Sequence, residues 1–108
     1  MITIFQGESC AWQGHLLDDE GQKVLDIQDY MIHIVLTTTN EKPLYEWDNL
    51  NIVFDDEGNF AIRLTSKATS DMIPGTYNMQ ATLSLDGESF VFAKTKNVIK
   101  VRPSKKGV

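Results

Sequence analysis

The segment from Asp55 to Phe92, DDEGNFAIRLTSKATSDMIPGTYNMQATLSLDGESFVF, decides the fold class of this chain. Between residues 76 and 85, polar and apolar side chains alternate for five cycles, and the odd positions are apolar: Tyr77, Met79, Ala81, Leu83 and Leu85. This period of two is typical of a strand with one buried face, because a helix would spread the same side chains around its axis. Residues 60–64 repeat the pattern. The segment therefore predicts at least two strands that face one core.

Shorter patterns of the same kind fill the rest of the chain. We expect further strands at residues 2–6, 10–17, 31–37, 44–47, 50–54, 90–95 and 98–102. Leu50, Ile52 and Phe54 are expected to form an inward row, and Met31 alternates with Ile32. Clusters of Asp, Gly and Asn separate them, and Asp86-Gly87 is a strong signal for a two-residue hairpin. One helical turn is expected from Ser66 to Met72, capped by Ser66 and terminated by Ile73-Pro-Gly75. The pattern favours an all-β fold, an immunoglobulin-like antiparallel β-sandwich of about seven strands.

Length and composition favour a single domain. The chain has 108 residues, of which 42% are hydrophobic, enough for one core. We expect the sandwich to span residues 1–103 and residues 104–108 to form a flexible C-terminal tail. Cys10 is the only cysteine, so no internal disulfide can form and packing must hold the fold.

Three aromatic side chains have predicted positions in such a sandwich. Tyr77 follows a Pro-Gly corner at the start of a long strand, where sandwiches of this type often place a tyrosine that bonds back to the connecting loop. An ordinary core position for Tyr77 explains the sequence equally well. Trp12 and Trp47 are expected to bridge the two sheets in the core, whereas exposed tryptophans would mark a contact surface.

Charge argues against binding to nucleic acid. The net charge is -5, and phosphate binding needs a clustered basic face. The C-terminal part is an exception, because no acidic residue follows Glu88. Its basic residues either protect an edge strand against association or form a contact strip for an acidic protein partner. The candidate contact residues are Lys94, Lys96, Lys100 and Arg102.

The sequence carries no pattern for a membrane segment or a signal peptide. Its apolar runs are far shorter than the roughly 18 residues that a spanning helix needs. The N-terminus has neither a basic region nor a long apolar region. We therefore expect synthesis in the cytoplasm and no membrane partner.

The sequence gives little support for catalysis, metal binding or a cofactor. The acidic turns at residues 18–21 and 55–58 do not fit the helical calcium loop, because Leu16 or Val53 would occupy the first ligand position. A looser calcium site shared by both turns is a weaker alternative to solvated turns. His15, His33 and Cys10 lack metal-ligand spacing, and neither a nucleophile elbow nor a phosphate loop is present. We expect no catalytic residue, no metal and no cofactor.

Several motifs resemble one protein family over nearly the whole chain. They are Ile-Phe-Gln-Gly-Glu-Ser near the start, Glu-Gly-Asn-Phe-Ala-Ile-Arg-Leu-Thr-Ser-Lys-Ala-Thr, Ile-Pro-Gly-Thr-Tyr, and the closing Ile-Lys-Val-Arg-Pro-Ser. Their order is similar to that of small immunoglobulin-like proteins encoded in phage and prophage structural clusters, which resemble the N-terminal domain of the phage baseplate upper protein. Two of the family's motifs occur as variants, Gly7-Glu-Ser9 and the corner from Thr69 to Tyr77. The resemblance implies a non-enzymatic tail-associated or baseplate-associated virion protein, with no catalytic residues to carry over.

Two other function classes stay open at this point. A bacterial surface domain for adhesion or carbohydrate contact would have the same sandwich, and exposed Trp12, Trp47 and Tyr45 on one face would favour it. An enzyme would need a convergent acidic pair in a concave pocket. Our hypothesis is a structural module that presents a sheet edge or a loop end to other protein subunits, with self-association as a further expectation.

Overall fold

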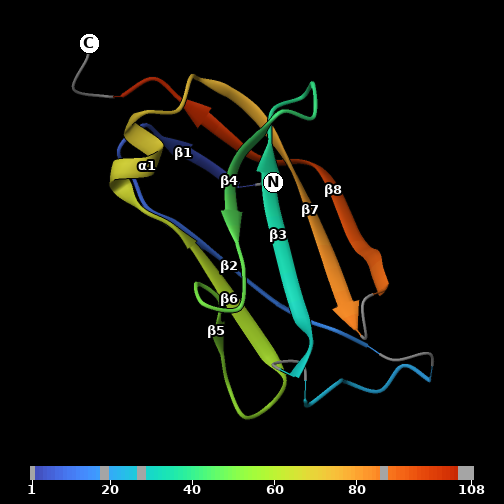
Figure 1. The fold of residues 1–108 in the computed structure, drawn as a ribbon. Helices are drawn as coiled ribbons and strands as arrows, with labels where there is room; N and C mark the ends of the chain where they lie inside the picture. The colour runs from blue at the N-terminus through green and yellow to red at the C-terminus, as the bar shows by residue number, and fades with distance from the viewer. Residues whose placement is uncertain (1, 18–19, 27–28, 86–87, 105–108) are drawn as a thin grey trace.

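A computed structural model shows two β-sheets packed face to face, with one short helix (Figure 1). It describes residues 2–17, 20–26, 29–85 and 88–104, without the side chains of 85 and 88–97. The larger sheet has the order β1-β8-β7-β3-β4 and the smaller one the order β2-β6-β5. The elements are β1 (Ile2–Phe5), β2 (Cys10–His15), β3 (Met31–Thr37), β4 (Pro43–Trp47), β5 (Val53–Phe54), β6 (Asn59–Leu64), α1 (Ser66–Ser70), β7 (Gly75–Leu85) and β8 (Glu88–Arg102).

The order of strands confirms the predicted β-sandwich of immunoglobulin type. In that fold, strands B, E and D share one sheet, and G, F and C share the other. Here β2, β6 and β5 correspond to the first set, and β8, β7 and β3 to the second. All pairings are antiparallel except that of β1, which runs parallel to β8. The described chain has eight strands, against the seven or so that we expected.

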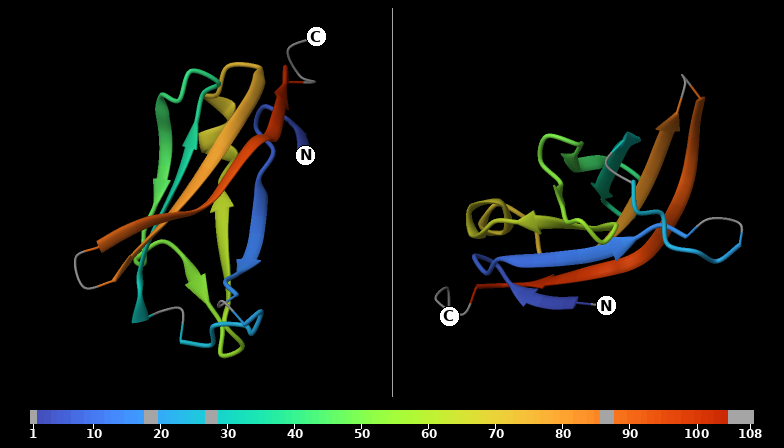
Figure 2. Two further views of the ribbon diagram at one scale, coloured as in Figure 1. Left: turned by 90° about the vertical axis from the view of Figure 1, so that its right-hand side faces the viewer. Right: turned by 90° about the horizontal axis from the view of Figure 1, so that it is seen from below.

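The alternating pattern places apolar side chains between the sheets, as expected. Each strand of the alternating type buries every second residue, so its two faces differ in polarity. The buried core consists of Ile4, Ile32, Ile34, Leu36, Trp47, Ile52, Ile62, Leu64, Met72, Tyr77, Ala81, Leu83, Ile99 and Val101. The whole molecule is elongated, with extents of 50 × 28 × 24 Å (Figure 2).

Three expectations about local structure were wrong. The two strands expected at 90–95 and 98–102 form one strand, β8, because irregularities in its pairing with β7 absorb the break in the pattern. Leu50 does not point inward: its side chain is 93% exposed in the turn between β4 and β5. Thr65, and not Ser66, caps α1, since its side-chain oxygen accepts a hydrogen bond from Ala68 N at 3.2 Å.

Two predicted turns and the C-terminal tail lie largely outside the described residues. Asp86-Gly87 is not described, although Leu85 and Glu88 on either side of it are paired. Residues 18–19 are likewise outside, within a segment whose ends are joined by a bridge between Leu17 and Lys23. Of the tail, only Ser104 is described, and its backbone N donates to Gln6 Oε1 at 3.1 Å.

The predicted tyrosine corner is present at the start of β7. The Tyr77 side chain is buried, and its hydroxyl donates a hydrogen bond to the carbonyl oxygen of Ile73 in the connection from α1. This bond fixes the connection to the strand that follows it. Burial also raises the pKa of the Tyr77 hydroxyl above its ordinary value of 10.0, so the hydroxyl keeps its proton as a donor at neutral pH.

The two tryptophans meet between the sheets, as expected. Trp47 in β4 is buried and Trp12 in β2 is half-buried, and their ring centroids lie 6.4 Å apart at an interplanar angle of 68°. This edge-to-face geometry is the preferred one for aromatic pairs. Trp47 Nε1 also donates to the carbonyl oxygen of Arg63 in β6, at 3.1 Å. One residue thus links the large sheet to the small one by packing and by a hydrogen bond.

We predict that Tyr77→Phe lowers the free energy of unfolding by about 1–2 kcal/mol, because the Ile73 carbonyl loses its donor next to the core. Urea denaturation followed by tryptophan fluorescence measures the change. Tyr45→Phe is the matched control, since the Tyr45 hydroxyl donates to the Ala68 carbonyl from a half-buried side chain that water can reach. A loss no larger for Tyr77→Phe than for Tyr45→Phe would contradict the corner's structural role.

A second prediction concerns two glycines with nearly the same backbone conformation. Gly58 has φ +79° and Gly21 has φ +78°, so alanine is strained at both, by about 1–2 kcal/mol. A Cβ at Gly58 would also lie 2.5 Å from the Val24 carbonyl oxygen, whereas nothing lies within 4 Å at Gly21. Thermal unfolding should therefore show a clearly larger loss of stability for Gly58→Ala than for Gly21→Ala. Equal losses would mean that the turn does not pack on the Val24 backbone.

Candidate functional site

The candidate contact residues from the sequence lie on β8, which is the expected edge strand over residues 88–98 but not at its C-terminal end. β1 covers β8 from Ile99 to Arg102, so this part lies between β1 and β7. Lys100 and Arg102 are exposed, and the Arg102 guanidinium carbon lies 5.7 Å from the centroid of the Phe5 ring. Lys94 and Lys96 belong to the same strand, but their side chains are outside the described part of the structure. The structure therefore brings together two of the four candidates, at the end of β8.

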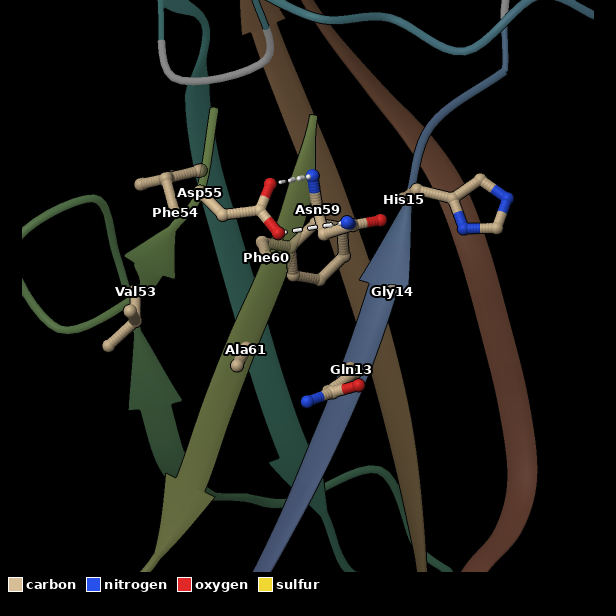
Figure 3. A pocket seen from close by; sticks show the side chains of 9 residues that line it. All are labelled: Gln13, Gly14, His15, Val53, Phe54, Asp55, Asn59, Phe60 and Ala61. Carbon is tan, nitrogen blue, oxygen red and sulfur yellow. Dashed lines mark hydrogen bonds between the residues drawn. The ribbon is translucent and has the colours of Figure 1, made fainter. Parts of the chain in front are cut away.

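A shallow pocket of about 380 Å³ lies on the outer face of the small sheet (Figure 3). Its most polar group is Asp55, whose carboxylate accepts hydrogen bonds from Asn59 Nδ2 at 2.8 Å, Asn59 N at 2.9 Å and Glu57 N at 2.8 Å. These bonds, with Asn59 first, lower the pKa of Asp55 below its ordinary value of 3.8. The His15 ring points away from this carboxylate (Figure 3). Asp55 thus stabilises the turn between β5 and β6 through these three hydrogen bonds.

The aromatic residues that a carbohydrate surface would need are engaged elsewhere. Trp47 is buried, Trp12 packs against it, and Tyr45 is half-buried with its hydroxyl bonded to Ala68 O at 2.9 Å. They do not form an exposed stacking face. Cys10 is also half-buried, and burial raises the pKa of its thiol, which disfavours the reactive thiolate.

The acidic and histidine side chains of the described residues do not gather into a metal-binding group of three or more. His33 instead pairs with Glu46 on the neighbouring strand, with His33 Nε2 and Glu46 Oε1 3.1 Å apart, and both are exposed. The acidic pair at residues 18–19 lies outside the described part, so the calcium site shared by two turns is not tested.

The edge of β2 is open in the smaller sheet. β2 pairs with β6 on one side in an unbroken register from Cys10 to His15, and no described strand pairs with its other side. The strand has no Lys, Asp, Glu or Pro, the residues that usually protect an edge. Trp12 Nε1 is buried nearby without a hydrogen-bond partner among the described residues. This edge is a second possible contact surface.

A hollow with exposed apolar side chains lies at the end of the sandwich where β3 begins and β7 ends, here called the loop end. Met31 is 73% exposed and Leu50 is 93% exposed, and both line this hollow of about 550 Å³. Tyr30 and Ile32 form part of its wall, and two acidic residues, Asp29 and Asp48, lie at it. Large apolar side chains exposed together around a concavity mark a contact site more often than isolated ones do.

Asn49 holds the two sides of this hollow together. Its side-chain oxygen accepts a hydrogen bond from Ile32 N at 2.7 Å, and its side-chain nitrogen donates to Tyr30 O at 2.7 Å. Asp48 fixes the same turn, since Asp48 Oδ1 accepts from Leu50 N at 2.9 Å. Leu50 is therefore presented on a turn tied to the start of β3, and little order has to be gained when a partner binds.

Sequence reasoning missed this site because Leu50 was counted in an inward row with Ile52 and Phe54. The available signal was Asp48-Asn49, since both residue types favour turns through side-chain bonds to the backbone. A turn over 48–51 removes Leu50 from the strand and exposes it. Met31 was already expected to alternate with the inward residue Ile32, so its outward position agrees with the pattern.

Comparison with known proteins does not add a relative. No protein-family model matches the chain, and no curated protein matches it. No helix among the described residues is long and apolar enough to cross a membrane. The assignment of a function therefore depends on the surfaces described above and on the resemblance in the sequence.

We predict that the carboxyl group of Asp55 titrates below its ordinary pKa of 3.8 and that Asn59→Ala raises this value, because the leading side-chain donor is lost. A lowered pKa in the folded state means that Asp55 adds stability above its unfolded pKa and loses it as the pH falls through the folded pKa. Carbon-detected NMR titration of the side chain measures both values. Asn51→Ala serves as the control, and an unchanged Asp55 pKa in Asn59→Ala would contradict the proposed cause.

Proposed function

We propose that this chain is a non-enzymatic structural module that binds another protein subunit through the hollow at its loop end. The observation that carries the proposal is the exposure of Met31 and Leu50 around a hollow whose backbone Asn49 holds in place. Because the backbone under this surface is already held, covering it costs mainly the rotamer freedom of the two side chains, about 0.5–1.5 kcal/mol for each.

The magnitude of the apolar contribution is consistent with specific binding. Complete burial of a Met or Leu side chain contributes about 1.5–3 kcal/mol, so the two together supply about 3–6 kcal/mol before the cost of association. That term alone does not give a stable complex, because losing translational and rotational freedom costs about as much or more. The partner must therefore make further contacts, and the acidic residues Asp29 and Asp48 at the hollow are the candidates for them.

We further propose that the assembly is a phage or prophage virion, with the chain associated with the tail or baseplate. This part rests on the sequence resemblance together with the immunoglobulin-like order of strands. A role in surface adhesion or in catalysis draws less support, because the aromatic residues and the Asp55 carboxylate serve the fold itself. We propose no cofactor, no nucleic-acid partner and no membrane partner.

The test asks whether purified phage particles contain the chain and whether its incorporation requires the hollow. Tagged chain is expressed in cells that encode it, after deletion of the chromosomal copy and induction of the prophage, and purified particles are examined by immunoblot and immunogold electron microscopy. We expect the wild type in the tail fraction and a loss of about tenfold or more for Leu50→Asp, since a buried charge opposes docking.

Val53→Asp is the matched control, because Val53 is 69% exposed but lies at the outer face of the small sheet, away from the hollow. It should enter particles like the wild type. Absence of the wild-type chain from particles would overturn the virion proposal, and equal incorporation of Leu50→Asp and wild type would overturn the role of the hollow.

A further inference from the structure

An exposed apolar side chain also lies at the opposite end of the sandwich. Ile73, in the connection between α1 and β7, is 78% exposed. It comes two residues before Gly75, which is paired with Val101 on β8. Val101 lies between the exposed cations Lys100 and Arg102. We call this region, formed by Ile73, Lys100 and Arg102, the corner end.

The corner end is as firmly held as the loop end. The Tyr77 hydroxyl donates to the carbonyl oxygen of Ile73, and Gln6 Nε2 donates to the carbonyl oxygen of Met72 at 2.7 Å. The backbone N of Gln6 also donates a hydrogen bond to the carbonyl oxygen of Arg102 in β8, at 2.9 Å. These bonds fix the backbone on both sides of Ile73, so its side chain projects from a rigid corner.

The two ends differ in charge. Exposed acidic residues gather in the connections at the loop end: Glu20, Asp26, Asp29, Asp48, Asp55, Asp56 and Glu57. Lys23 is the basic residue described among them. The corner end carries Lys100 and Arg102, with Lys67 on α1 and Lys42 in the connection between β3 and β4. The described acidic residues at this end are Glu8, Asp71 and Glu41. Four described cations against three carboxylates leave this end with one net positive charge, whereas the loop end has a clear excess of acidic residues.

We propose that copies of this chain associate head to tail, with Ile73 of one copy seated in the Met31–Leu50 hollow of the next. Lys100 and Arg102 then face Asp29 and Asp48 across the contact. The inference rests on the proposed function, because it names the partner of the same hollow as a second copy. Each side offers an apolar centre, and the charges around the two centres have opposite sign, which favours this pairing over contact between like ends.

The position of the two ends determines the kind of assembly. Gly75 begins β7 near the corner end, and Ser84, opposite Met31, lies near the loop end. Nine steps along a strand separate them, a distance of about 30 Å. Because the two surfaces are different and lie at opposite ends of an elongated molecule, each copy can use both of them at once (Figure 1). Such a heterologous contact builds a row or, if the rotation closes, a ring.

The test uses one variant for each end and then mixes the two. Leu50→Asp disables the loop end and leaves the corner end intact, whereas Ile73→Asp does the reverse. Sedimentation velocity over a range of concentrations should show wild-type chain growing beyond the dimer and each variant weakened by about tenfold to a hundredfold. An equimolar mixture should form a dimer and stop there, because the intact corner end of Leu50→Asp binds the intact hollow of Ile73→Asp.

Salt and a control variant add two further readouts. Raising the ionic strength should weaken wild-type association, since the charges around the contact are solvent-exposed. Val53→Asp should associate like the wild type, which shows that an added surface charge alone has no effect. Circular dichroism and thermal unfolding of every variant confirm that each one folds, and both substituted side chains are exposed enough for this to be expected.

Three outcomes would overturn the inference. The first is a wild-type chain that stays monomeric at every concentration. The second is an association that Leu50→Asp abolishes but Ile73→Asp leaves unchanged. The third is a mixture of the two variants that forms no dimer. In each of these cases the hollow could still bind a different subunit. The incorporation of Leu50→Asp into particles tests that proposal independently, so one proposal can fail without the other.

Discussion

The two sheets of this protein are held together by packing, without a covalent link. Antibody-type sandwiches place a disulfide between strands B and F and pack a tryptophan against it. This chain has a single cysteine, Cys10, so the corresponding restraint must come from side-chain contacts. Trp47 supplies much of it, because its ring packs edge to face on Trp12 and its Nε1 donates to a carbonyl of the opposite sheet. Together with the rest of the buried core, this contact keeps the two sheets in the register on which both ends of the molecule depend.

Hydrogen bonds extend this rigidity from the core to both ends of the sandwich. At one end Tyr77 fixes the connection that carries Ile73, and at the other Asn49 ties the turn that carries Leu50 to the start of β3. Both apolar side chains are therefore exposed on backbone that is already ordered. An exposed Leu or Ile on a mobile loop would lose backbone entropy on binding, whereas the backbone that carries these two is already ordered. The architecture thus suits a part that is assembled with others better than one that reshapes around a small ligand.

The polar groups that could have suggested chemistry are used by the fold. Asp55 accepts three hydrogen bonds within its own turn, and His33 pairs with Glu46 across two strands. A catalytic carboxylate would need a substrate-facing oxygen and a pKa suited to proton transfer near neutral pH, and the bonds to Asp55 move its pKa the other way. These residues therefore serve the fold, and the open edge of β2 remains a further surface that the described strands leave unpaired.

The sequence alone determined which segments are strands and which of their faces are buried, because the alternation of side chains is a local property of the chain. It also offered the tyrosine corner as one of two positions for Tyr77 and predicted that the two tryptophans lie between the sheets, as they do. It could not determine that Leu50 leaves its row, that β8 is one strand paired with β1 from Ile99 to Arg102, or that Ile73 and Arg102 share one end. The exposure of Leu50 depends on a turn that the Asn49 side chain bonds to the start of β3. The pairing of β8 and the nearness of Ile73 to Arg102 depend on segments that are distant in sequence and that meet only in the folded sandwich.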